Sequence, residues 1–174
     1  MKADLDCLEC IVKQALRAAR IAGDDPAKQR QVIDRVVADI PGMDLNDSPA
    51  VLSLNAYRYV HEIFGVSDAY RAMKEEQNRM ALSLEPELER LVQTSAEPLI
   101  TAIRLAAAGN IIDLGILQSH EIDPHKAINQ AMSAPLALEH TDLFLRDLEH
   151  CTDLLYLLDN AGEIVFDKVL IKEL

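Results

Sequence analysis

The chain has 174 residues, of which 49% are hydrophobic and 26% charged, and it carries a formal net charge of −12 at pH 7. Such an acidic surface repels phosphate backbones, which argues against nucleic-acid binding, and no run of apolar residues is long enough to suggest a membrane span. Because the amino terminus is acidic and the three cysteines are odd in number, we expect a cytoplasmic protein without a disulfide framework.

Apolar residues at helical spacing predict a series of helices along most of the chain. The first expected helices cover residues 4–22, 26–40, 49–65 and 67–85. Asp25-Pro26 and Ser48-Pro49 are typical of helix starts, because an acceptor side chain precedes a first-turn proline. Pro86 is expected to interrupt the fourth helix, since a proline removes a backbone donor. A longer apolar helix should then run to about Ala108, with a bend at Pro98.

The pattern changes after Ala108. Gly109 to Gly115 is expected to break the helix, since two glycines bracket polar residues there. Two helices should follow, from Asp123-Pro124 to about Ser133 and from Thr141 to about His150. The apolar run at 154–158 predicts the first strand, over residues 153–158, and a last helix begins near Gly162.

The predicted fold class is mainly α. A helical domain is expected over residues 1–150, followed at 151–174 by the first β–α unit of an α/β domain. A lone parallel strand needs neighbouring strands to satisfy its backbone. We therefore expect short strands earlier in the chain, a partner chain or a missing C-terminal half to complete the sheet.

Asp159 and Asn160 follow the predicted strand directly. Their carboxylate and carboxamide oxygens are hard donors, which suit Mg²⁺ or Mn²⁺ better than a thiophilic metal. Gly162 would let a ligand approach the backbone, and the amides after it could receive a phosphate. An ordinary Asp-Asn turn has the same residues, so this alternative stays open.

Two further residue pairs are candidates for chemistry. Asn110 and Asp113 would share one face of a helical turn and could contact a ligand, although from these residues alone helix capping is the better explanation. Cys7 and Cys10 form a C-x-x-C motif, with Cys151 as the only other thiol. A closed zinc site needs four ligands, so buried structural thiols are expected, and thiol-bound zinc or redox chemistry is the alternative. The sequence contains no dinucleotide-binding, P-loop or serine-hydrolase motif.

Four segments together resemble the damage-control phosphatase family, formerly known as domain of unknown function 89. The similarity is greatest to its stand-alone prokaryotic branch with an amino-terminal C-x-x-C. In chain order the segments are DLDCLEC at 4–10, GVSDAY at 65–70 with Lys74 and Asn78, AGNIIDLG at 108–115, and LDNAGE at 158–163. The resemblance implies a helical amino-terminal domain and a Rossmann-like α/β domain. It also implies a metal-dependent phosphatase that hydrolyses phosphorylated small metabolites.

The resemblance also implies roles for single residues. Asp159 and Asn160 match the family's metal-binding pair, for which Mn²⁺, Co²⁺, Ni²⁺ or Mg²⁺ is expected, and Glu163 could orient a metal-bound water. Residues at the substrate or its phosphate would be Asn110, Asp113 and Gly162. The third metal-binding carboxylate and the basic substrate-holding residues are expected beyond Leu174, so these residues alone should have little or no activity. The alternatives are a non-catalytic helical interaction or regulatory module and a thiol-based zinc or redox protein.

Overall fold

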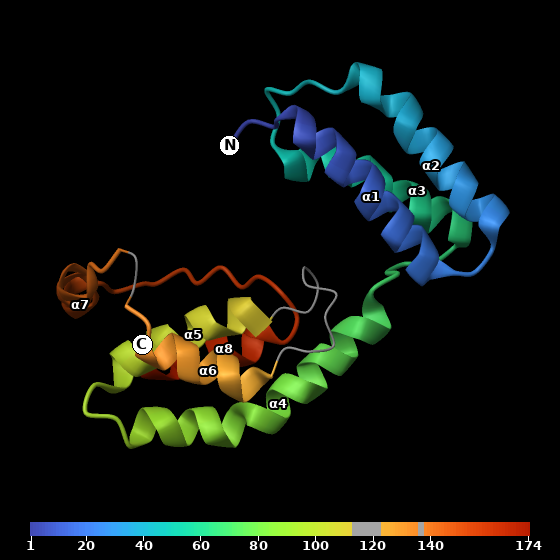
Figure 1. Cartoon of the computed structure of the whole chain (residues 1–174). Helices are drawn as coiled ribbons and strands as arrows, with labels where there is room; N and C mark the ends of the chain where they lie inside the picture. The colour runs from blue at the N-terminus through green and yellow to red at the C-terminus, as the bar shows by residue number, and fades with distance from the viewer. Residues whose placement is uncertain (113–122, 136–137) are drawn as a thin grey trace. The chain divides into compact units, whose positions relative to one another are not determined.

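The computed structural model describes residues 1–112, 123–135 and 138–174 (Figure 1). Within those residues the backbone forms eight α-helices and one short 3₁₀-helix, with no strand, so the predicted mainly α class is confirmed for them. None of these helices combines the length and apolar content needed to cross a bilayer. The helices are α1 Leu5–Ala22, α2 Pro26–Asp39, η1 Ile40–Gly42, α3 Pro49–Phe64, α4 Arg71–Gln93, α5 Pro98–Ile112, α6 Pro124–Ser133, α7 Thr141–His150 and α8 Glu163–Glu173.

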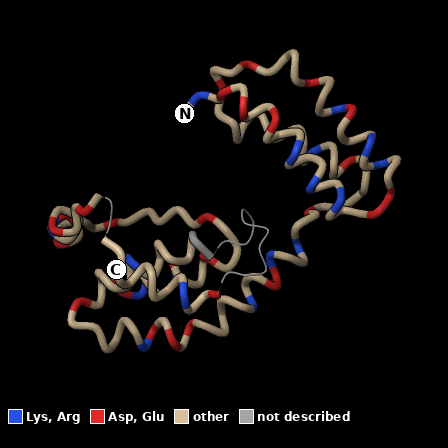
Figure 2. Tube along the Cα trace, in the orientation of Figure 1, with Lys and Arg blue, Asp and Glu red and all other residues tan. Residues whose placement is uncertain are grey.

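The chain divides into two units, Met1–Ala72 and Met73–Leu174, and each has its own apolar core. In the first unit α1, α2 and α3 pack against one another. In the second unit α5 packs against both α6 and α8, and one face of α4 joins the same core. Acidic and basic residues are interspersed along the helices of both units (Figure 2). The predicted boundary between residues 150 and 151 stays a prediction.

Three helices begin where the sequence predicts, because a side-chain oxygen caps each one. Asp25 Oδ1 accepts the Ala27 N–H at 2.9 Å in front of α2, and Asp123 Oδ1 accepts the His125 N–H at 3.0 Å in front of α6. Ser48 Oγ accepts a longer bond from an amide in the first turn of α3. In all three helices a proline follows the cap, where its missing N–H costs no hydrogen bond.

The predicted interruption at Pro86 is wrong, because α4 continues through this residue. A buried apolar stripe runs along one face of α4 on both sides of the proline, and it consists of Ala81, Leu84, Leu88 and Val92. Burying each large side chain contributes about 1.5–3 kcal/mol, which together outweighs a proline cost of about 3 kcal/mol. The break falls instead between α4 and α5, where Ser95 Oγ accepts the Glu97 N–H at 3.1 Å and Pro98 opens the next helix.

The break predicted at Gly109 is also wrong, since α5 runs through it to Ile112. A Cβ atom at Gly109 would lie 2.9 Å from the Cβ of Phe166 on α8. Phe166 is fully buried there. Gly109 therefore brings two helices close together and does not end one. Asp113, Gly115 and the rest of the expected break lie outside the described residues.

The strand predicted over residues 153–158 is not formed within the described residues. The segment is extended, but its backbone makes no hydrogen bond to any other backbone group described. A strand requires a neighbour for those groups. Its four leucines are exposed, and only Tyr156 is partly buried. The apolar segment thus has the extended backbone of a strand but no neighbouring strand among the described residues.

Replacing Gly109 with alanine should destabilise the unit that contains it by about 1–3 kcal/mol, because the added methyl group would overlap Phe166. Chemical unfolding followed by circular dichroism measures the change. Gly42→Ala is the matched control, since nothing lies within 4 Å of a Cβ built there. Equal stability of the two variants would contradict the close approach.

Candidate functional site

The site begins in the loop between the extended segment and α8. Gly162 precedes α8 with φ +80°, a conformation that favours glycine because a Cβ would be strained. The Ile164 N–H donates to the Asn160 carbonyl at 3.3 Å, and the Val165 N–H donates to the Gly162 carbonyl at 3.1 Å. These bonds fold residues 159–162 into a tight turn at the amino end of the helix.

Asn160 is oriented by its neighbour Glu163. The Asn160 carboxamide nitrogen donates to Glu163 Oε2 at 3.3 Å. Since the nitrogen end is engaged, the carboxamide oxygen is the end that can bind a cation. The turn therefore holds a carboxylate at Asp159 and an amide oxygen at Asn160 on adjacent residues, as the sequence predicts for a hard cation.

An open pocket of about 520 Å³ lies beside this turn. Asn110 from α5 lines it together with Asp159 and Glu163, so the structure brings these three predicted site residues together. Gly162 does not line this pocket and lies instead against Gln77 of α4. Asp113 lies outside the described residues. The pocket wall is completed by Ala106, Ala107, Leu155, Tyr156, Leu157 and Asp167.

Tyr156 and Asp167 form a pair that the sequence reasoning missed. The Tyr156 hydroxyl donates to Asp167 Oδ1 at 2.7 Å, and Asp167 is only 6% exposed. Burial and the Asp167 acceptor raise the pKa of the Tyr156 phenol well above its usual range. The bond fastens the extended segment to α8. The sequence contains a signal for Asp167, because it follows Glu163 by four residues and so lies on the same face of the helix as this predicted site residue.

The pocket gathers negative charge. Burial raises the pKa of the Glu163 carboxyl, hydrogen bonds from Asn160 lower it, and the charges of Asp167 and Asp159 raise it. Among the described residues, no three His, Cys, Asp or Glu side chains converge closely enough to hold a metal ion. The oxygen donors at Asp159 and Asn160 fit a hard divalent cation in chemistry, although they complete only part of a coordination sphere.

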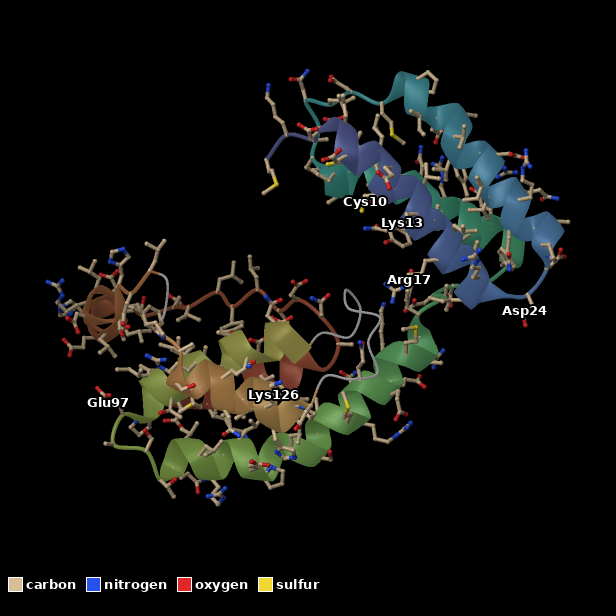
Figure 3. The ribbon with its side chains drawn as sticks, in the orientation of Figure 1. Cys10, Lys13, Arg17, Asp24, Glu97 and Lys126 are labelled. Carbon is tan, nitrogen blue, oxygen red and sulfur yellow. The ribbon has the colours of Figure 1, made fainter. Side chains whose placement is uncertain are left out.

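The thiols do not form a comparable site within the described residues. Cys7 Sγ accepts the Asp4 N–H at 3.4 Å, and the exposed Cys10 contacts Gln14 Nε2 at 3.2 Å. Cys10 lies on the same side of α1 as Lys13 (Figure 3). Cys151 belongs to the other unit, directly after α7, and its thiol donates to the carbonyl of Leu148 in that helix. The expected burial is wrong for Cys10 and Cys151, which are exposed. No group of three or more possible metal ligands surrounds a thiol in the described part of the chain.

The second unit thus defines a class of protein: helices packed around a turn that presents an acidic, oxygen-rich pocket. The protein-family model of the damage-control phosphatase ARMT1-like domain matches residues 3–174 of this sequence. The chain therefore belongs to this family. This confirms the resemblance inferred from the four sequence segments.

Three curated relatives are similar to the chain over nearly its whole length. An uncharacterized protein of Methanocaldococcus jannaschii is 31% identical over 97% of this chain and 57% of its own length. A damage-control phosphatase of Archaeoglobus fulgidus is 30% identical over 100% of this chain and 61% of its own. A damage-control phosphatase of Pyrococcus horikoshii is 24% identical over 100% and 60%. The chain therefore spans about three fifths of the length of these relatives.

A solved structure shares the fold. The crystal structure of a DUF89 family protein from Pyrococcus horikoshii superposes with a TM-score of 0.85 at 21% sequence identity. The match covers 99% of this chain and 60% of that one. The helical arrangement described above is therefore part of a larger known fold.

Tyr156→Phe should destabilise the chain by about 1–3 kcal/mol, because the buried Asp167 carboxylate loses its hydroxyl donor. Tyr57→Phe is the matched control, since its hydroxyl donates to the exposed Gln14 side chain and its loss should change stability by about 0.5 kcal/mol or less. Urea unfolding of both variants measures the difference. Equal stability in the two would show that the Tyr156 bond does not fasten the segment.

Proposed function

We propose that the chain is the helical part and first β–α unit of a metal-dependent phosphatase that hydrolyses phosphorylated small metabolites. The observation that carries the proposal is the pocket where Asn110, Asp159 and Glu163 meet. These residues lie in the two motifs that resemble the family, and they come from two different elements. The names of the Archaeoglobus and Pyrococcus relatives support the same activity.

Asp159 and Asn160 are the residues that would hold the metal. A divalent cation supplies charge neutralisation at the phosphate and lowers the pKa of a bound water. Asn160 presents its oxygen because its nitrogen is held by Glu163. Burial raises the pKa of Glu163, so its carboxyl group holds a proton more readily than an exposed glutamate and is suited to exchanging one with a water molecule. Asn110 can donate its carboxamide N–H to a substrate oxygen.

The active unit requires more polypeptide than these residues. The extended segment has a continuous apolar sequence, which is typical of a strand that is buried on both faces of a sheet. In the structure its leucines are exposed, and its backbone forms no hydrogen bond to another backbone group within the described residues. The relatives continue for about two fifths of their length outside the matched region. We propose that strands from a partner chain or from that remaining length complete a Rossmann-like sheet and supply a third metal-binding carboxylate.

Calorimetric titration with Mn²⁺ tests the metal site in the chain as it stands. Weak binding is expected in the wild type, and Asn160→Ala should weaken it roughly tenfold or more, because one of two adjacent ligands is lost. Asn129→Ala, an exposed position on α6, is the control and should bind as the wild type does. Stoichiometric zinc that is lost on Cys7→Ser would favour the thiol site, and no binding of divalent metal at all would favour a non-catalytic module.

Assays with sugar phosphates and phosphopantetheine in the presence of Mn²⁺, Co²⁺, Ni²⁺ or Mg²⁺ test the activity. Residues 1–174 alone should hydrolyse these substrates little or not at all. The chain joined to the remaining α/β region of a relative should hydrolyse at least one of them, and Asp159→Ala should lower that rate by about 100-fold or more, because removing a metal ligand abolishes the charge stabilisation at phosphorus. Full activity of Asp159→Ala would refute the assigned role.

A further inference from the structure

We infer that Asn78, on α4, is a positioning residue for the Asp159–Asn160 metal ligands, an inference that rests on the proposed function. Asn78 Oδ1 accepts the Gly162 N–H at 2.8 Å across 84 residues of sequence. Both residues are shielded from solvent at least in part. The bond ties the turn that carries the ligands to a different helix of the same unit.

The turn also lies directly against α4 at this point. A Cβ at Gly162 would be 3.4 Å from both the Cβ and the carbonyl oxygen of Gln77, the residue before Asn78. The space left between the turn, α4 and α5 is only about 10 Å³, at the lower limit of what one water molecule occupies. The contact is therefore close-packed, so the hydrogen bond has no ready replacement from solvent.

The other backbone bonds of the turn are local. The Ile164 and Val165 amides donate to carbonyls of the turn itself, which shapes the turn but does not place it in the unit. The Asn78 bond is different, because it fixes the carboxyl end of the turn relative to α4. Asn110 comes from α5, whose core face packs in the same cluster as that of α4. Asn78 thus sets the distance between the ligands of the turn and the far wall of the pocket.

This geometry also gives the Gly162 amide a structural role. Its N–H is already donated to Asn78, so a phosphate could use it only by displacing that bond. A phosphate near the turn would therefore be bound by side chains and by backbone amides other than that of Gly162. Asn78 acts through the turn and does not line the pocket that Asp159 and Glu163 share.

Two substitutions separate the role of the acceptor from the size of the side chain. Asn78→Leu keeps the branched shape and the number of non-hydrogen atoms of the side chain but has no acceptor, whereas Asn78→Asp keeps an oxygen that can accept the Gly162 N–H. Asn129→Leu, at an exposed position of α6, is the matched control for an apolar replacement in the same unit. All are made in the 174-residue chain and checked for folding by circular dichroism.

The measurement follows the backbone amide signals of residues 159–163 by ¹⁵N NMR, with hydrogen exchange at Gly162 and paramagnetic broadening by added Mn²⁺. In Asn78→Leu we expect exchange at Gly162 about fivefold faster or more. We also expect the Mn²⁺ midpoint to rise about tenfold. Asn78→Asp should restore both to within about threefold, and the control should match the wild type.

The outcomes are distinct. A folded Asn78→Leu with a wild-type Mn²⁺ midpoint overturns the positioning role, even if its stability falls, because a purely structural bond would lower stability alone. A loss in Asn78→Leu that Asn78→Asp does not restore also overturns it. If Mn²⁺ leaves residues 159–163 unbroadened in the wild type, the proposed function itself fails.

Discussion

The pocket depends on the close approach of α5 and α8 at Gly109. Because Gly109 has no side chain, the Phe166 ring can lie against the backbone of α5, where a Cβ would come within 2.9 Å of it. Asn110 follows Gly109, and Glu163 and Asp167 lie on α8 close to Phe166. The contact that buries an aromatic side chain in the core therefore also brings the polar groups of two helices to one pocket. A larger residue at Gly109 would separate them.

Two further bonds fasten the chain around this contact. Tyr156 joins the extended segment to α8 through Asp167, and Asn78 joins the turn to α4. Asp159 and Asn160 lie between these two fastened points. Their placement thus comes from three helices and a partly buried tyrosine, although Asp159 itself is exposed. A turn that is held at both ends in this way keeps its side chains in a defined position.

Local signals predicted much of the fold. Capping side chains followed by prolines predicted the starts of α2, α3 and α6, since both effects act within one turn. The helix breaks predicted at Pro86 and Gly109 are wrong. Whether the helix continues there depends on the buried stripe of α4 and on the ring of Phe166, 57 residues from Gly109, and local rules include neither contact. The strand at 153–158 was predicted from its apolar run, but a strand is a property of two segments, and the described residues hold only one. At the pocket, the motifs predict Asp159, Asn160 and Asn110 as site residues, and this assignment stays a prediction. The contacts of Asn78 and Asp167 are not predicted, because their partners lie far away in sequence or in a neighbouring element.

The central claim is that the turn at Asp159 and Asn160 binds a divalent cation. An anomalous-scattering map at the manganese absorption edge, from crystals of the chain soaked in Mn²⁺, tests it most directly. The account predicts a peak within bonding distance of the Asp159 carboxylate and the Asn160 carboxamide oxygen, about 2.1–2.6 Å as for other hard cations bound to oxygen. A peak only at Cys7 and Cys10, or an Asn160 whose carboxamide oxygen faces Glu163 with no peak at the turn, would contradict it.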